Sequence, residues 1–239
     1  GVNAYKTPEI DIGNKKVRYY FNYKKEGFIP RIVKELIERR IRVKEILKKD
    51  RDNVHLKARD YALKTILNSF YGYFGFFAAR YYCLECAASI TAFGRDYILK
   101  TIKKAEDAGF NVIFSDTDSV CIALDNKTDE DALNFMEEVN KELPSLMEFE
   151  LEDFYPKGIF VMKKAEIKGA KKKYALIDRN GKIKVKGFET IRRDWSYVAR
   201  ELQDKILSMI LKDDDINGAF EYVKEVIEKI NKREIPIEK

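Results

Sequence analysis

Apolar residues recur at helical spacing through the first third of the chain. Between Phe28 and Lys49 they fall mostly three or four positions apart, and Pro30 stands in the first turn, where proline is tolerated. A second helix is predicted over 54–70, after a short KKDRDN turn, and so short a connection predicts an antiparallel helix pair. Residues 1–26 mix polar and aromatic positions without a clear period, and we expect a loop with a short hairpin there.

The remaining pattern predicts helices packed against antiparallel strands. Helices are expected at 87–108, ended by Gly109, and at 129–143, 194–211 and 217–231. Thr128 and Asp194 are the expected N-caps of two of them. Strands are expected at 147–151, 158–162, 173–177 and 183–186, with Asn180-Gly181 as a hairpin turn. The fold class is therefore α+β, an antiparallel sheet with packed helices.

Two carboxylates stand at the tip of another predicted hairpin. The apolar runs NVIF and SVCIAL flank the string FSDTDS, and this pattern predicts a strand, a tight turn and a second strand. Asp116 and Asp118 should therefore lie together, and such hard oxygen ligands suit Mg²⁺. Taken alone, a D-x-D turn is more often a solvated hairpin than a metal site.

A second string, KTILNSFYG from Lys64 to Gly72, precedes the hairpin string, with 41 residues between them. Lys64, Asn68 and Tyr71 are spaced i, i+4, i+7, so that a cation, an amide and a phenol share one helical face. Lysine binds phosphate as a point charge. Together the two strings indicate a nucleoside triphosphate held between a cationic helix and a carboxylate metal site.

The charge of the chain alternates in sign along its length. From Arg31 to Lys64 there are 12 Lys/Arg and 6 Asp/Glu, a net charge of +6. From Glu106 to Pro156 there are 2 and 15, a net charge of −13, and from Lys157 to Arg193 there are 13 and 3, a net charge of +10. Basic faces suit a phosphate backbone and an acidic patch suits divalent cations, although any single block also fits a solvated face.

Composition narrows the setting. No apolar run approaches the roughly 18 to 20 residues of a membrane span, and the opening lacks a signal-peptide pattern. We therefore expect a soluble, cytoplasmic protein with no membrane partner. The chain lacks a starting Met, and we expect a piece of a longer chain or one subunit of a split protein. The chain has a single Gln among many Lys and Glu, and this composition indicates a thermophilic source.

The order and flanks of these strings resemble family B DNA polymerases, and archaeal replicative enzymes most closely. In that family K-x-x-x-N-S-x-Y-G lies on a fingers helix and a Y-x-D-T-D-S hairpin lies in the palm. Four more matches follow in the family's order: GFIPRIVKELIERR from Gly27, RYYCLECAASITAFGR from Arg80, KKKYALID from Lys171 and RRDWS from Arg192. The resemblance covers the chain from about Gly27 onward.

The resemblance implies a domain plan and an activity. Residues 1–27 would be a connector and part of the palm, 28–75 an antiparallel-helix fingers domain, 76–193 the palm and 194–239 an incomplete base of the thumb. The implied activity is template-directed addition of dNTPs to a primer 3′-OH by two-metal phosphoryl transfer. Implied partners are primer-template DNA, dNTPs and a sliding clamp reached through residues beyond this chain. The implied location is with the nucleoid.

The resemblance also implies roles for individual residues. Asp118 would ligate Mg²⁺ directly, with Asp116 in a supporting place. Lys64, Arg40 and Lys44 would neutralise the triphosphate. Asn68 would assist there and Tyr71 would lie against the nascent base pair. DNA contacts are implied at Thr117, Lys173, Tyr174 and Arg193.

The C-x-x-C formed by Cys83 and Cys86 leaves two interpretations open. Zinc would need two more ligands, which the only histidine, His55, cannot supply. Similar polymerases from hyperthermophiles carry a disulfide at this position, whereas two buried helical thiols are the equal alternative.

One expected string is missing from the sequence. The family's first catalytic carboxylate lies in a D-x-x-S-L-Y-P-S string, which does not occur in this chain; Asp153-Phe154-Tyr155-Pro156 is only a superficial echo. Two Mg²⁺ ions must clamp both the attacking and the leaving oxygen, so a second carboxylate ligand is expected from an upstream portion or subunit, together with any exonuclease. The alternative is a non-catalytic DNA-binding relative or scaffold subunit.

Glu150 and Glu152 are expected on one side of a strand. They could bind an accessory ion, but an ordinary exposed strand face is the better interpretation.

Overall fold

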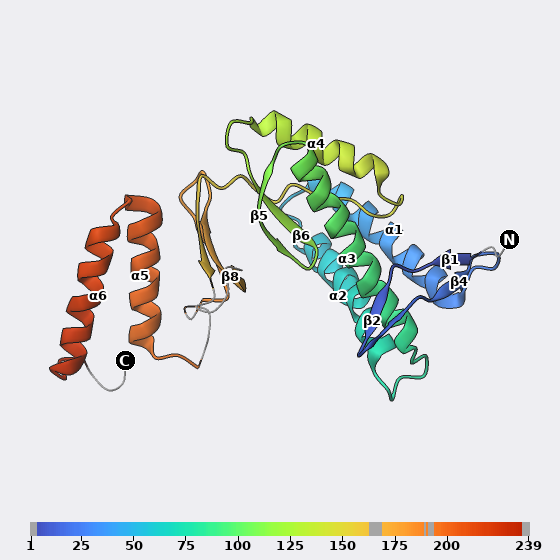
Figure 1. The fold of residues 1–239 in the computed structure, drawn as a ribbon, viewed down its shortest axis with the longest axis horizontal. Coiled ribbons are helices and arrows are strands. Elements are labelled where there is room, and N and C mark those ends of the chain that lie inside the picture. The colour runs from blue at the N-terminus through green and yellow to red at the C-terminus, as the bar shows by residue number, and fades with distance from the viewer. Residues whose placement is uncertain (1–3, 163–168, 189, 191–193, 236–239) are drawn as a thin grey trace. The chain divides into compact units, whose positions relative to one another are not determined.

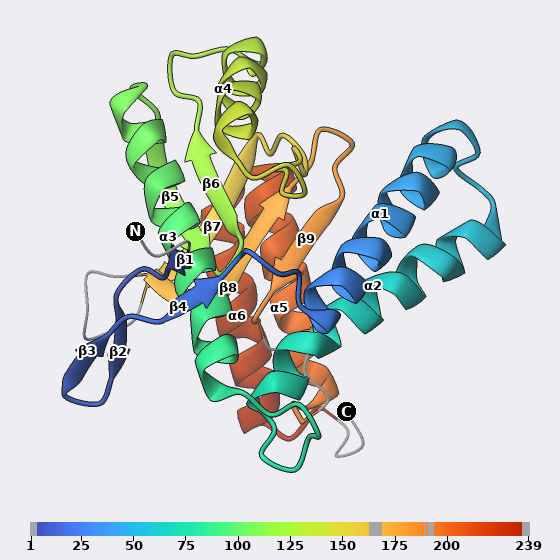
Figure 2. The same cartoon turned by 90° about the vertical axis from the view of Figure 1, so that its right-hand side faces the viewer.

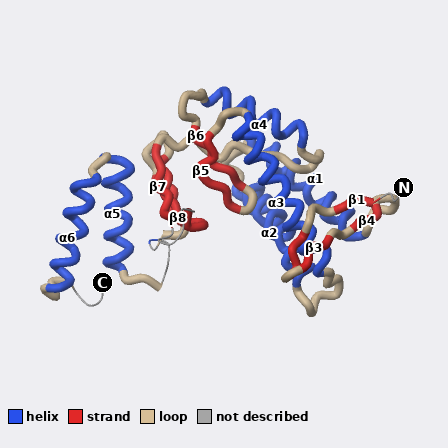
Figure 3. Tube along the Cα trace, viewed as in Figure 1, coloured by secondary structure: helices blue, strands red, loops and turns tan. Residues whose placement is uncertain are grey.

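The computed structural model describes residues 4–162, 169–188, 190 and 194–235. The chain divides into two compact units, Gly1–Phe149 and Glu150–Lys239, which are described separately (Figure 1). The residues predicted as palm are thus shared between both units. All four small sheets in the described part are antiparallel, so the mixed helix and sheet content agrees with the α+β prediction (Figure 3).

The first unit begins with two short antiparallel ladders. β1 (Ala4–Lys6) pairs with β4 (Tyr20–Asn22), and β2 (Ile10–Ile12) pairs with β3 (Lys15–Val17). Gly13, at φ 59°, supplies the left-handed conformation of the turn between β2 and β3. The predicted hairpin is therefore present in this segment, as a long ribbon in two parts.

Two 22-residue helices, α1 (Phe28–Lys49) and α2 (Val54–Gly75), form the predicted antiparallel pair (Figure 2). Asn53 caps α2 by accepting a hydrogen bond from the backbone N–H of Leu56 at 3.0 Å. The helix continues five residues past the predicted end at Phe70, and its end lies against the start of the next helix, where the Cys83 N–H donates to the Phe74 carbonyl at 3.1 Å. Tertiary contact here overrides the helix-weakening effect of two glycines.

The long helix α3 (Leu84–Asp107) is the central element of the first unit, and it starts three residues earlier than predicted. It contacts α2 as well as the strands β5 (Asn111–Asp116) and β6 (Ser119–Ala123). Its buried side chains are small or aliphatic and include Ala92, Ile98 and Ala105. Small residues let neighbouring elements approach closely, so α3 joins the helical pair to the carboxylate hairpin.

The helix α4 (Asp129–Glu142), which belongs to the acidic part of the chain, covers this core. The Thr128 side chain accepts from the Asp131 N–H at 3.2 Å, and the Asp131 carboxylate accepts from the Thr128 N–H at 2.7 Å, which completes a capping box. The backbone N–H and the hydroxyl of Thr128 both donate to the Asp131 carboxylate, and these hydrogen bonds lower its pKa. The predicted N-cap is confirmed.

The strand expected at 147–151 is absent, which corrects the prediction. The side-chain amide of Asn140 makes two hydrogen bonds to the backbone of this segment. Asn140 Nδ2 donates to the Phe149 carbonyl at 2.9 Å, and Asn140 Oδ1 accepts from the Phe149 N–H at 2.7 Å. These two hydrogen bonds replace those that a neighbouring strand would make to the same backbone groups. The alternating apolar and polar residues of this segment therefore do not pair with a neighbouring strand.

This bridge predicts a stability effect. Asn140→Ala leaves two part-buried backbone groups of Phe149 without their partner, and we expect the free energy of unfolding to fall by about 1–3 kcal/mol. Asn134→Ala, an exposed position on the same helix, is the control and should change it by less than about 0.5 kcal/mol. Urea unfolding followed by circular dichroism measures both. Equal effects of the two variants would show that the bridge adds no stability.

The second unit is a three-stranded antiparallel sheet with two helices. The strand order is β7 (Lys157–Met162), β8 (Gly169–Ile177) and β9 (Ile183–Lys186). Gly181, at φ 78°, lies in the predicted turn, where the Asp178 carboxylate accepts from the N–H groups of Asn180 and Lys182 at 2.8 Å. The core of this unit joins the sheet to the first of the two helices through Ala175, Ile177, Phe188, Leu207 and Leu211.

The helices α5 (Tyr197–Asp213) and α6 (Ile216–Asn231) pack on each other. Asp194 is not the cap of α5: the Ser196 hydroxyl accepts from the Ala199 N–H at 3.3 Å, so the cap lies two residues later than predicted. Asp215 caps α6 through the N–H of Gly218 at 2.7 Å, so the acidic string DDDING from Asp213 to Gly218 joins α5 to α6. Among the helices described, none is long and apolar enough to cross a bilayer.

Candidate functional site

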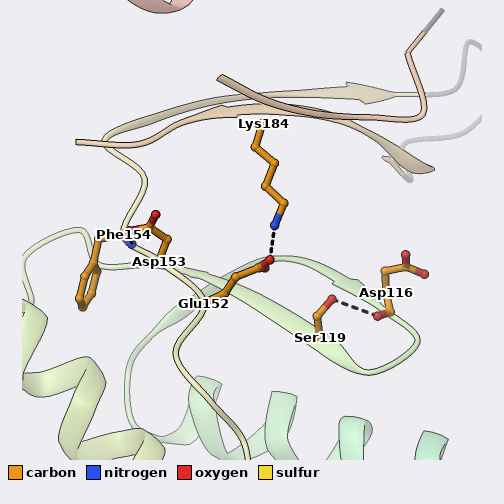
Figure 4. Close-up of polar contacts among 6 residues, drawn as sticks. All are labelled: Asp116, Ser119, Glu152, Asp153, Phe154 and Lys184. Carbon is orange, nitrogen blue, oxygen red and sulfur yellow. Dashed lines mark hydrogen bonds and ion pairs between the residues drawn. The ribbon is translucent and has the colours of Figure 1, made fainter. Parts of the chain in front are cut away.

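The carboxylate pair lies at a strained turn between β5 and β6. Asp116 and Ser119 are partners in the strand register, so Thr117 and Asp118 form the loop (Figure 4). The Asp118 N–H donates to the Asp116 carbonyl at 2.6 Å and Thr117 has φ 53°, which together describe a γ-turn centred on Thr117. A β-branched residue rarely adopts positive φ, and such strain is characteristic of functional sites.

The two carboxylates of this turn have different surroundings. Asp116 is half-buried; its Oδ1 accepts the Thr117 hydroxyl at 3.0 Å, and its carbonyl accepts the Ser119 hydroxyl at 3.1 Å. Asp118 is exposed, and no described residue donates to its carboxylate or pairs with it. The Asp118 oxygens are therefore available to an external cation, while the Asp116 carboxylate is built into the turn.

This donor set fits one part of a magnesium site. Carboxylate oxygens are the ligands that Mg²⁺ takes from proteins, and the ion keeps several waters besides. Within the described residues, no group of three or more His, Cys, Asp or Glu side chains is placed to hold a metal. Asp118 could thus contribute a direct ligand with Asp116 beside it, and further ligands would have to come from water, substrate or another polypeptide.

The predicted cationic face lies on the helical pair. Lys64, Asn68 and Tyr71 are exposed along one side of α2, as their spacing predicts. Arg40 and Lys44, one turn apart on α1, are half-buried. Because α3 contacts both α2 and the β5–β6 hairpin, the two strings singled out in the sequence belong to one compact unit.

An ion pair between the helices was not anticipated from the sequence. Arg40 Nε donates to Asp60 Oδ1 at 2.9 Å, and the two side chains are 29 % and 25 % exposed. Asp60 lies one turn before Lys64 on the same face of α2. The antiparallel pairing of the two helices was the only signal that could have placed Arg40 opposite an acid.

The described residues among those implied to contact DNA lie in different environments. The hydroxyl of Thr117 is held by Asp116. In the second unit, Lys173 Nζ lies 5.4 Å from the centre of the Phe188 ring, whereas Tyr174 is only 8 % exposed and packs with Phe160 at 5.8 Å between ring centres. Arg193 lies outside the described residues. Of the pair on β8, Lys173 has the more accessible side chain and Tyr174 belongs to the core.

Glu152 is tied to the sheet of the second unit. Its carboxylate pairs with Lys184 on β9 (Figure 4). The Nζ of Lys184 also lies 5.8 Å from the centre of the Tyr155 ring. Burial alone would lower the pKa of Lys184, but the hydrogen bond and charge of Glu152 outweigh burial and raise it. Glu152 therefore has a structural partner, and the segment that carries it is not the strand face expected from the sequence.

The two cysteines of the C-x-x-C lie at the start of α3 as free thiols. Cys83 is the N-cap residue, Cys86 lies in the first turn, and their sulfurs are 3.1 Å apart. Burial, together with the hydrogen bond to Cys83, raises the pKa of Cys86 to about 12, so this thiol is protonated at neutral pH. The proximity is compatible with either interpretation, and the disulfide stays a prediction.

Comparisons with known proteins now identify the family. The model of DNA polymerase family B matches residues 2–239. "DNA polymerase 1" of Pyrococcus abyssi is 46% identical over 220 residues, which is 89% of this chain and 28% of that protein. A "DNA polymerase" of Pyrococcus glycovorans is 44% identical over 239 residues, covering 97% of this chain and 30% of that one.

A solved structure agrees with these relatives. The family B DNA polymerase from the hyperthermophilic archaeon Pyrobaculum calidifontis superposes with a TM-score of 0.67 at 31% identity, over 92% of this chain and 28% of that polymerase. The chain thus spans less than a third of the length of the relatives it matches. Because the family model matches almost every residue, the chain belongs to the family B DNA polymerases.

Proposed function

We propose that this chain supplies the fingers, much of the palm and the base of the thumb of a DNA polymerase, which adds dNTPs to a primer 3′-OH on a DNA template. The observation that carries the proposal is the exposed Asp118 carboxylate, with which no described residue pairs, at a strained D-T-D turn in a chain of this family. The domain boundaries proposed are 1–27, 28–75, 76–193 and 194–239.

The chain's own residues then have separate tasks. Asp118 would bind Mg²⁺, with Asp116 fixing the turn, and Lys64, Arg40 and Lys44 would hold the triphosphate on the fingers. Bound Mg²⁺ would supply charge stabilisation to the oxygens of the transferring phosphoryl group. Asn68 would assist at the triphosphate, and Tyr71, on the same face of α2, would lie against the nascent base pair. Such positioning and charge stabilisation account for most of the catalysis expected in phosphoryl transfer.

Primer-template DNA is the proposed macromolecular partner. The block from Lys157 to Arg193 has a net charge of +10, and contacts to phosphates depend on such charge and carry little sequence preference. Lys173 is the described residue of this block that we assign to the duplex. The first carboxylate motif would come from an upstream portion or subunit, since the D-x-x-S-L-Y-P-S string does not occur here.

A second candidate is a non-catalytic DNA-binding or scaffold relative, and the absent first carboxylate string favours it. A scaffold has no physical need for a triphosphate-binding face. Nucleotide binding therefore separates the two functions.

The test is binding of a dNTP with Mg²⁺ to the 239-residue chain, measured by titration calorimetry. Lys64→Ala should weaken it about tenfold, because a hydrogen bond to a charged group contributes about 1.5–3 kcal/mol and exposure keeps Lys64 at the lower end. Lys103→Ala, an exposed lysine of α3, removes the same charge and should leave binding unchanged. Equal affinity of the two variants would remove the nucleotide site from this face.

A further inference from the structure

The Arg40–Asp60 ion pair uses only part of the guanidinium. The contact is made by Nε, which donates to Asp60 Oδ1 at 2.9 Å. Arginine carries five N–H donors, so four remain on the two terminal nitrogens. No other described residue pairs with Arg40 or accepts from it. Asp60 thus fixes the inner nitrogen and leaves the outer nitrogens for another acceptor.

The surroundings of the pair favour an anion as that acceptor. Lys64 follows Asp60 by one turn on α2, and Lys44 follows Arg40 by one turn on α1, so each member of the ion pair has a lysine one helical turn away on its own helix. An arginine whose outer nitrogens are free binds phosphate through two parallel hydrogen bonds, which a lysine cannot make. Both side chains of the pair are about three-quarters buried, and burial restricts the rotation that would misdirect the fork.

Two effects of Asp60 on a bound triphosphate oppose each other. Its negative charge repels the phosphates, so a purely competitive role predicts tighter binding when Asp60 is removed. Its hydrogen bond orders Arg40 before the nucleotide arrives, and ordering a flexible side chain in advance improves affinity. Contact through Nε alone preserves the terminal nitrogens, which is the arrangement expected for orientation; a competitor would occupy them.

We propose that Asp60 is a positioning residue for nucleotide binding: it orients Arg40 through Nε so that the terminal nitrogens of the guanidinium face the triphosphate. The inference rests on the proposed function, because it deepens the role assigned to Arg40 on the fingers. Asp60 does not touch the nucleotide and acts through Arg40.

The experiment measures binding of Mg²⁺-dATP to the 239-residue chain by calorimetry at fixed ionic strength. Asp60→Ala should weaken binding about 3- to 10-fold, the effect of losing the order of one flexible side chain. Asp60→Asn keeps an oxygen that accepts from Nε and should stay within about twofold of the parent chain. Asp96→Ala is the matched control, since it removes another carboxylate that is paired with a lysine, Lys100, at 2.7 Å, and should leave binding unchanged.

A double-mutant cycle shows whether Asp60 acts through Arg40. In an Arg40→Ala background, Asp60→Ala should no longer weaken binding. Arg40→Lys keeps the charge, but a lysine has a single nitrogen. If this nitrogen pairs with Asp60, no further nitrogens remain to bind phosphate, so the variant should bind Mg²⁺-dATP about as weakly as Arg40→Ala. The lysine variant also tests the proposal if Asp60→Ala fails to fold.

The outcomes are distinguishable. Unchanged or tighter binding by Asp60→Ala, an Asn variant as weak as the Ala variant, a loss that persists without Arg40, or parent-like binding by Arg40→Lys would each overturn the positioning role. If Arg40→Ala and Lys64→Ala both bind as the parent chain does, the nucleotide site itself is wrong. A loss in those two variants with none in Asp60→Ala would leave the proposed function standing and remove only Asp60.

Discussion

The 239-residue chain alone is expected to leave a primer unextended in Mg²⁺ and all four dNTPs. A two-metal transfer needs ligands that clamp the attacking and the leaving oxygen together. The D-T-D turn offers the exposed Asp118 with Asp116 beside it, and no larger group of metal-binding side chains occurs among the described residues. We expect synthesis to appear on mixing the chain with a polypeptide that carries a D-x-x-S-L-Y-P-S string from an archaeal family B polymerase.

The measurement is gel-resolved extension of a labelled primer annealed to a longer template. The informative control is an upstream polypeptide whose string carries Ala in place of its Asp, which should bind the chain but restore nothing. Robust Mg²⁺-dependent extension by the 239 residues alone would contradict the proposed division of the site. Failure of every mixture, with DNA binding intact and no nucleotide binding, would favour the scaffold interpretation.

In the reconstituted enzyme, Asp118→Ala should lower kcat by at least about 10²- to 10³-fold, the usual effect of removing one preorganised charge-stabilising group. The affinity for duplex DNA should hardly change, because the basic block that we propose to bind phosphates is untouched. Asp116→Ala should retain measurable activity, since the Asp116 carboxylate already accepts the Thr117 hydroxyl and serves the turn. Steady-state kinetics on both variants decides the assignment.

Two further variants separate metal binding from turn geometry. Asp118→Asn keeps the shape of the side chain but removes the charge, and it should be nearly as inactive as Asp118→Ala. Thr117→Val removes the hydroxyl that donates to Asp116 while keeping the β-branched shape, and should cost far less. An inactive Asp116→Ala beside an active Asp118→Ala would reverse the ligand assignment.

Local spacing in the sequence was enough to predict most elements. The helical pair, the hairpin with its two carboxylates, the Thr128 cap and the Asn180-Gly181 turn are each determined by residues a few positions apart. Their interactions are short-range, so the pattern of a few neighbouring residues carries the information. The exposed face with Lys64, Asn68 and Tyr71 belongs to the same class, because helical periodicity alone places the three together.

The tertiary structure decided the features that depend on residues far apart in the chain. Asn140 binds the backbone of Phe149 and prevents a strand that alternation predicted, contacts to α3 prolong α2, and sheet packing buries Tyr174. Asp60 meets Arg40 across 20 residues, a pairing fixed by how two helices align. A single sequence gives periodicity but not the register between elements, and that register determines which polar groups find partners. The sequence by itself therefore determined which residues we propose for the chemistry, and the packing of the helices determined how Arg40 is held.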